Sequence, residues 1–186
     1  IRNLVRDLKP TVLIGVRGEL ARTPGRPAVR LGATILQTGT PDAELCAFAR
    51  ERGAIVSFES AANAGDLIAS SDCAALLTPE QAARFAKDRK GPWLAVYHLR
   101  SLTENKSTSH AEVAQEILDL RRTLGAQHLL VVPGDFRDQT YAAQAPTLHP
   151  GIAWQLKLSN LKPDEISRLL GGNLVNLIDR IRPKTP

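Results

Sequence analysis

The sequence predicts an α/β protein built from parallel βα repeats. Short apolar, β-branched segments alternate along the chain with longer segments of helical periodicity, which is typical of βαβ units. The strand segments are apolar at successive positions, as strands of a parallel sheet covered on both faces must be. Two architectures fit this pattern: an open doubly wound sheet and a (β/α) barrel. In both, ligands bind at the carboxyl ends of the strands.

In the first half of the chain, turn and cap signals separate the predicted elements. The predicted strands cover residues 11–16, part of 28–39, 54–60 and 73–78. Between the second and third of these strands a helix is expected, with Thr40 as its N-cap and Gly53 at its end. A short helix is predicted at residues 64–69. A further helix is expected with Thr78 as its N-cap, Pro79 in its first turn and Gly91 at its end.

The second half continues the alternation up to one irregular region. A strand at residues 93–99 leads through a polar connection to the longest helix, 110–125, whose apolar residues recur at helical spacing. A strand at 128–132 follows. We expect residues 139–160 to be irregular because they contain Pro146 and Pro150, with a short strand or helix near 152–158. The chain closes with a helix at 162–181, broken at Gly171-Gly172.

The length of 186 residues predicts a single α/β domain. The chain begins with Ile1 and contains no methionine, so we expect a trimmed chain or the C-terminal part of a longer protein. It has no apolar run of about 18 residues and no secretory signal pattern, which predicts a cytoplasmic protein with no membrane association. Cys46 and Cys73 are too few for a disulfide framework or a metal knuckle, and we expect both to be buried.

The net charge of +5 mildly favours acidic partners. The densest basic group is Arg17, Arg22, Arg26 and Arg30, and the remaining basic residues are dispersed. A solvated basic surface explains this distribution more simply than a nucleic-acid site does. Aromatic residues make up 4% of the chain, which argues against a platform on which bases stack.

Polar residues that follow predicted strands are the candidates for chemistry. Glu59 lies at the end of the strand at 54–60 and Asn63 follows it, and they could bind a substrate or cap the next helix. His98 lies near the end of its strand and Arg100 two residues later, so both side chains point the same way and suit an anionic substrate. Asp135 follows the last strand after a Pro-Gly turn, where it is a candidate catalytic carboxylate or a turn residue.

The motifs of several enzyme classes are absent. The sequence contains no Gly-x-Ser-x-Gly elbow, no His-x-His pair and no His-Glu-x-x-His pair. The segment "GVRGEL" has two glycines but neither the dinucleotide-binding spacing nor a P-loop lysine. A nucleophilic triad and a self-contained zinc site are therefore unsupported.

Two segments resemble the C-terminal end of metal-dependent TIM-barrel hydrolases of the amidohydrolase superfamily. These are "LGAQHLLVVPGD", residues 124–135, and "DEISRLLGGNLVNLI", residues 164–178. The resemblance covers about the last third of the chain and favours the barrel, complete or partial, over the open sheet. It implies that Asp135 binds a metal or carries the proton of the attacking water. The family's first-strand His-x-His is missing, so the implied metal site is degenerate.

Another segment, "WLAVYHLRSL", carries a different resemblance. It is followed by a polar connection, a long helix and a strand. This order is similar to that of the p30 subunit of ribonuclease P, a barrel of the polymerase-and-histidinol-phosphatase type. The resemblance implies a metal-free barrel that associates with RNA. The net positive charge agrees with it, whereas the "GGN" helix and the scarcity of aromatic residues do not.

Our leading hypothesis is a TIM-barrel hydrolase relative that acts on a small anionic substrate. Asp135 and His98 are its candidate catalytic residues and the candidate ligands of a divalent metal, zinc. Arg100, Glu59 and Asn63 are the candidate substrate-binding residues. The alternatives are a non-catalytic RNA-binding barrel subunit and a structural subunit with affinity for neither metal nor polyanion. The sequence does not indicate an oligomeric state.

Overall fold

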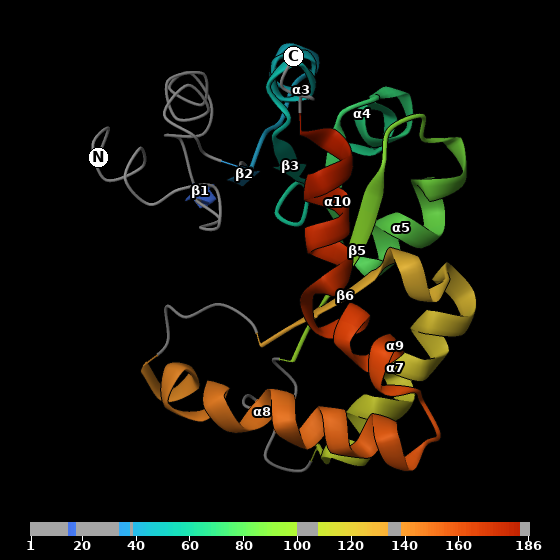
Figure 1. The fold of residues 1–186 in the computed structure, drawn as a ribbon. Coiled ribbons are helices and arrows are strands. Elements are labelled where there is room, and N and C mark those ends of the chain that lie inside the picture. The colour runs from blue at the N-terminus through green and yellow to red at the C-terminus, as the bar shows by residue number, and fades with distance from the viewer. Residues whose placement is uncertain (1–14, 18–33, 38, 100–107, 134–138, 183–186) are drawn as a thin grey trace. The chain divides into compact units, whose positions relative to one another are not determined.

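The computed structural model describes residues 15–17, 34–37, 39–99, 108–133 and 139–182 (Figure 1). For residues 15–17 and 139–147 it describes the backbone alone. Contacts divide the chain into two compact units, one of Ile1–Trp93 with Asn176–Pro186 and one of Leu94–Val175. Parallel strands alternate with helices in both units, which confirms the predicted α/β class.

In the first unit, strands β1 to β4 pair in parallel and in chain order. Parallel crossovers are right-handed almost without exception, so successive steps in one direction place α3 and α4 on the same face of the sheet. The strands are β1 (Gly15–Arg17), β2 (Ile35–Gln37), β3 (Ile55–Ser57) and β4 (Ala74–Leu77). The helices are α3 (Ala43–Arg52), α4 (Gly65–Ser70) and α5 (Pro79–Phe85), with the 3₁₀ turn η3 (Ala86–Asp88).

In the second unit, β5 (Trp93–His98) and β6 (Leu129–Val132) pair in parallel, with His98 opposite Val132. Helix α7 (His110–Leu124) and the 3₁₀ turn η4 (Ala126–His128) connect the two strands. After β6 come α8 (Gln139–Leu158), α9 (Pro163–Ser167), the π-type segment η5 (Arg168–Gly172) and α10 (Asn173–Ile181). The residues of α10 from Asn176 onward belong to the first unit.

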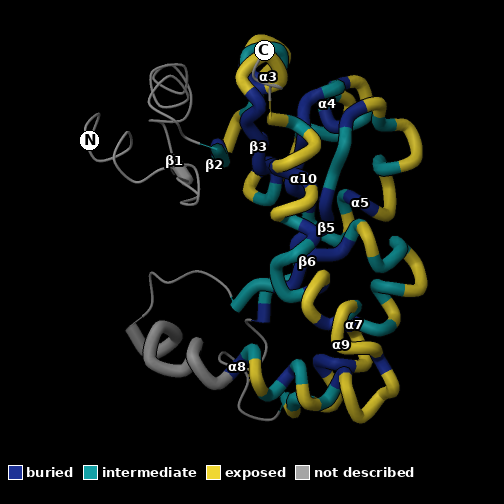
Figure 2. Tube along the Cα trace, in the orientation of Figure 1, coloured by how far each residue is buried: buried dark blue, intermediate teal, exposed yellow. Residues whose placement is uncertain are grey.

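The strands carry the core of each unit. Every residue of β3 and β4 is buried, so both faces of these strands are covered (Figure 2). The central residues of β5 and the first three residues of β6 are also buried. This agrees with the strands' continuous apolar sequences, which parallel sheets require.

Of the four boundaries predicted for α3 and α5, those at Gly53 and Thr78 are confirmed, and those at Thr40 and Gly91 are wrong. Helix α5 ends at Phe85 and is followed by η3, which ends at Asp88, before Gly91 is reached. Thr78 and Gln81 form a reciprocal capping box at α5, and Gly53 ends α3 in the left-handed conformation with φ of 64°. The N-cap of α3 is Asp42, not Thr40: its carboxylate accepts a hydrogen bond from the Leu45 amide at 2.7 Å. Aspartate caps at least as well as threonine, and Asp42 directly precedes the helix.

The prediction of an irregular region at 139–160 is wrong, because α8 is a helix of 20 residues. Leu148, Ile152 and Leu156 are buried and recur at intervals of four, so they form one apolar stripe along this helix. Burial of such a stripe outweighs the helix-breaking effect of prolines, which local propensity alone cannot reveal. The predicted break at Gly171 is confirmed, since its φ of 153° is strained for any residue with a Cβ.

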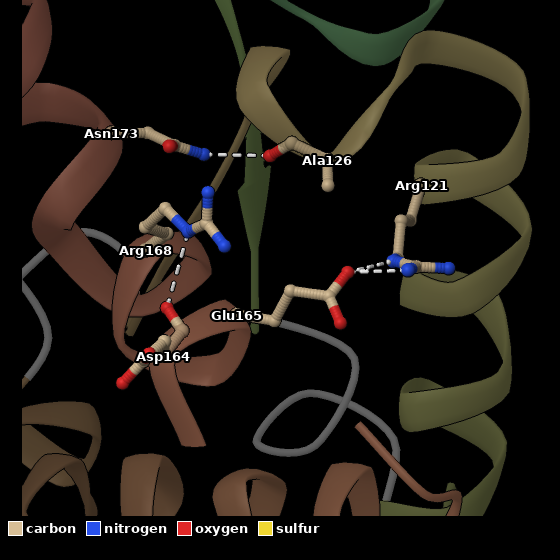
Figure 3. Close-up of polar contacts among 6 residues, drawn as sticks. All are labelled: Arg121, Ala126, Asp164, Glu165, Arg168 and Asn173. Carbon is tan, nitrogen blue, oxygen red and sulfur yellow. Dashed lines mark hydrogen bonds and ion pairs between the residues drawn. The ribbon is translucent and has the colours of Figure 1, made fainter. Parts of the chain in front are cut away.

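Two contacts join the segments that flank β6 in sequence (Figure 3). The buried Asn173 side-chain amide donates to the carbonyl oxygen of Ala126 at 2.7 Å, the bond drawn in Figure 3. It also donates to the carbonyl oxygen of Leu129 at 2.7 Å. The guanidinium of Arg121 in α7 forms an ion pair with Glu165 in α9. Asn173 therefore holds the start of α10 against the amino end of β6. Within the described residues, no helix is long and apolar enough to cross a membrane.

Replacement of Asn173 tests this anchor. We expect Asn173→Ala to lower the free energy of unfolding by about 2 kcal/mol, because two buried carbonyl groups lose their donor. Asn176→Ala is the matched control, since Asn176 is exposed on the same helix and its loss should change stability by less than about 0.5 kcal/mol. Urea unfolding followed by circular dichroism measures both. Equal midpoints for the two variants would contradict the anchoring role.

Candidate functional site

The contacts of Phe58 and Ser57 distinguish the two faces of strand β3. Phe58, directly after β3, is fully buried, and the Arg89 guanidinium lies 6.0 Å from the centre of its ring. The same guanidinium donates to the carbonyl of Ile68 in α4 at 2.7 Å. Phe58 therefore faces the helices. Because side chains alternate along a strand, Ser57 points to the opposite face.

On that opposite face, polar groups gather at the carboxyl ends of two neighbouring strands. The Ser57 hydroxyl donates to the Glu59 carboxylate at 2.8 Å, although Ser57 is only 1% exposed. Gln37 in β2 pairs in register with Ser57, and register partners in a parallel sheet point the same way. The candidate Glu59 therefore serves at least as the acceptor that satisfies a buried hydroxyl.

An open cleft of about 520 Å³ lies at the carboxyl ends of β2 and β3. One wall is the loop before α3, and the other is the connection from β3 into α4. The cleft is lined by Gly39, Thr40, Pro41, Ser60, Ala61, Ala62, Asn63, Ala64, Asp66 and Leu67. The candidate Asn63 belongs to this lining, whereas Glu59 does not. Clefts of this size and position commonly take small ligands in α/β proteins.

The cleft's chemical character is polar and nearly uncharged. Among the described residues that line it, the polar side chains are two hydroxyls, one amide and the carboxylate of Asp66, and none of these residues is basic. Such a lining suits a neutral ligand that offers hydroxyl or amide groups. The described part of the lining provides no cation for the anionic substrate that we expected.

One side chain fixes the wall between β3 and α4. The Gln81 amide nitrogen donates to the carbonyl oxygens of Phe58 at 2.9 Å and Ala61 at 3.2 Å. Its amide oxygen accepts from the backbone of Thr78 at 3.0 Å, which is half of the capping box of α5. Gln81 thus connects the start of α5 to the connection that lines the cleft. This holds the wall in place before any ligand binds.

In the second unit, the orientation of His98 follows from its neighbour. The Tyr97 hydroxyl donates to the Glu116 carboxylate of α7, so Tyr97 faces that helix. His98 therefore points to the face away from α7, together with its register partner Val132. It lies half-buried at the carboxyl end of β5, as the sequence predicted.

The other candidates of this unit cannot be placed. Arg100 and Asp135 lie outside the described residues. Asp135 follows Val132, the last residue of β6, by three positions in sequence. Among the residues that the structure describes, no three His, Cys, Asp or Glu side chains gather into a group that could hold a metal.

Several residues of the site were missed by sequence reasoning. Ser57 carried a usable signal, because it is the single polar residue within the apolar strand "AIVSF" and precedes Glu59 by two positions. Gln81 was recognisable as half of a capping box after Thr78. Its bonds to Phe58 and Ala61 are 23 and 20 residues away in sequence, so no local pattern could predict them.

Comparison with known proteins returns no matching family model, no similar curated protein and no similar solved structure.

Replacement of Gln81 tests the anchoring of the cleft wall. We expect Gln81→Ala to lower the free energy of unfolding by about 1–2 kcal/mol, because the helix cap and two carbonyl contacts lose their partner. Glu80→Gln is the control, since Glu80 is exposed on the same turn. Urea unfolding gives the stability, and amide hydrogen exchange at Ala61 to Ala64 gives the mobility of the wall. Unchanged exchange in Gln81→Ala would contradict this role.

Proposed function

We propose that this chain is a barrel-type hydrolase relative that binds a small substrate at the carboxyl ends of its strands. One observation carries the proposal. In both units, polar residues stand at the carboxyl ends of parallel strands, on the face away from α4 in the first unit and away from α7 in the second. Ser57 with Glu59 does so in the first unit and His98 in the second. In barrels this is the face and the end where chemistry occurs.

The strand order supports a barrel in preference to a doubly wound sheet. A doubly wound sheet requires a point where the order of the strands reverses. Strands β1 to β4 follow one another without reversal, as the strands of a barrel do. The contact of Asn173 with the start of β6 adds support, because it joins the two segments that resemble the TIM-barrel hydrolases.

In this proposal the residues have separate roles. Asp135 accepts a proton from the attacking water, and His98 returns a proton to the leaving group, so that water and substrate give two products. Arg100 is the candidate group for binding an anionic part of the substrate, and Asn63, which lines the cleft of the first unit, is a candidate for binding an uncharged ligand there. Glu59 accepts the hydrogen bond of the Ser57 hydroxyl, which orients both side chains at the end of β3. The resemblance implies a divalent metal such as zinc with Asp135 as a ligand, and His98 is the second candidate ligand because a neutral imidazole near a strand end can bind a metal.

Hydrolysis of chromogenic esters tests the proposal. The chain is assayed with p-nitrophenyl acetate and p-nitrophenyl phosphate, each with added zinc and with a chelator. We expect hydrolysis above the buffer rate, and a loss of about 10²- to 10⁴-fold in kcat for Asp135→Asn, because a general base is removed. Asp88→Asn is the matched control, since Asp88 is exposed in η3.

The outcomes separate the parts of this hypothesis. Equal rates for Asp135→Asn and the control would show that Asp135 does not act in hydrolysis. If the chelator does not change the rate, the reaction needs no metal, and proton transfer by Asp135 stays as the proposed chemistry. A rise in KM for Ala62→Trp, which fills the cleft, with no rise for the exposed Ala83→Trp would assign substrate binding to the cleft.

The second candidate function is a non-catalytic RNA-binding barrel subunit, and the net charge of +5 favours it. The exposed Arg50, Arg122 and Arg182 form ion pairs with carboxylates, which lowers the positive charge that they offer to RNA. RNA binding would therefore depend on basic residues outside these pairs.

Fluorescence anisotropy with a labelled RNA hairpin tests this second candidate. If the chain binds phosphates, Kd should rise at least about tenfold between about 50 and about 200 mM salt, because binding releases condensed counterions. Asp135→Asn should leave this affinity unchanged. A Kd that does not respond to salt would rule out a phosphate-binding surface.

A further inference from the structure

A second group of reactive side chains lies in the first unit, away from the cleft. It consists of Cys46, Cys73, Ser71 and Arg89. Cys46 is 2% exposed on α3, and Cys73, which directly precedes β4, is fully buried. Both cysteines are unbridged. The expectation that they are buried is therefore confirmed, but their position relative to each other was not foreseen.

The two thiols are neighbours. The Cys73 thiol donates to the Ser71 hydroxyl oxygen at 3.8 Å, and Cys46 lies close enough to Cys73 that each thiol shifts the pKa of the other. A separate contact supports this placement: Arg50, one helical turn after Cys46 on α3, forms an ion pair with Asp72, the residue before Cys73. Residues four apart share one side of a helix, so the same side of α3 brings Cys46 to Cys73.

Arg89 supplies a positive charge beside this pair. Its guanidinium donates to the Ser71 hydroxyl at 3.0 Å and to the carbonyl oxygens of Ile68 and Cys73. All these acceptors are neutral, and the buried Nε of Arg89 has no hydrogen-bond partner within the described part of the chain. A buried cation favours nearby anions. The Asp72 carboxylate supplies one negative charge near Arg89, and a Cys73 thiolate supplies another.

The surroundings shift the pKa values of the two cysteine thiols in opposite directions. The hydrogen bond from Cys46, with help from Ser71 and Arg89, lowers the pKa of Cys73 to about 7. The same hydrogen bond, together with burial, raises the pKa of Cys46. Near neutral pH, Cys73 is partly a thiolate and Cys46 remains a thiol. A thiolate next to a thiol is the arrangement that a two-step oxidation needs.

We propose that Cys73 and Cys46 form a reversible disulfide when the protein meets hydrogen peroxide, with Cys73 as the nucleophile and Cys46 as the resolving thiol. This site is independent of the proposed hydrolase function. The resulting bond links α3 to the start of β4. Because both thiols are buried, the proposed reaction includes a local opening that admits hydrogen peroxide, which is small and uncharged.

The chemistry proceeds in two balanced steps. The Cys73 thiolate attacks one peroxide oxygen, the O–O bond breaks, and hydroxide leaves, giving a sulfenic acid on Cys73. The Cys46 sulfur then attacks the Cys73 sulfur, the S–O bond breaks, and the proton of the Cys46 thiol leaves with the hydroxyl as water. The two thiols are oxidised by two electrons and the peroxide is reduced. A dithiol reductant reverses the bond by exchange.

Peptide mapping of the whole chain tests the disulfide itself. Trypsin separates the two cysteines into the peptides 31–50 and 53–84. After peroxide treatment we expect these peptides to be joined, with a mass lower than their sum by two hydrogens, and to separate again after reduction. Absence of the joined peptide would overturn the proposal. This measurement needs no variant, so a misfolded variant cannot obscure it.

Single variants test which cysteine reacts first. In Cys46→Ser, Cys73 should trap dimedone as a sulfenic acid at least about ten times faster than Cys46 does in Cys73→Ser, because the thiolate is the nucleophile. Equal labelling would overturn the assignment of roles. Arg89→Gln should slow formation of the disulfide in the intact pair, whereas Arg84→Gln, on the exposed side of α5, should not.

Discussion

Both faces of β3 and β4 are buried along their whole length, and this constraint decides where polar chemistry can occur in the first unit. A polar side chain within a doubly covered strand costs stability unless it finds a partner. Ser57 meets this requirement through Glu59. Polar groups that must meet a ligand are therefore confined to the carboxyl ends of the strands, where the cleft with Asn63 opens.

Two side-chain amides connect helix starts to distant backbone. Gln81 at the start of α5 holds the wall of the cleft, and Asn173 at the start of α10 holds the amino end of β6. An amide suits this task because it donates to two carbonyl groups without the cost of burying a charge. Each amide thereby fixes the position of a loop or strand end that apolar packing alone would leave adjustable.

Arg89 differs from these two amides because it carries a charge. Its guanidinium is partly buried and donates hydrogen bonds to uncharged oxygen atoms. A buried guanidinium shifts neighbouring equilibria toward the anion, and here the neighbouring acid is a thiol. The resulting low pKa of Cys73 depends on three segments that are separate in sequence: α3, the residues before β4 and the residue after η3. The reactive pair is thus a product of packing, and neither cysteine has a local motif.

The sequence by itself determined the α/β class, most of the strand positions, the capping box at Thr78 and the break at Gly171, because each depends on neighbours within a few residues. It also placed His98 at a strand end. Tertiary structure alone decided that 139–158 is helical, since burial of Leu148, Ile152 and Leu156 overcomes local proline propensity. It likewise decided the contact between the two cysteines and the cleft, because these join residues whose proximity arises only when parallel strands pair.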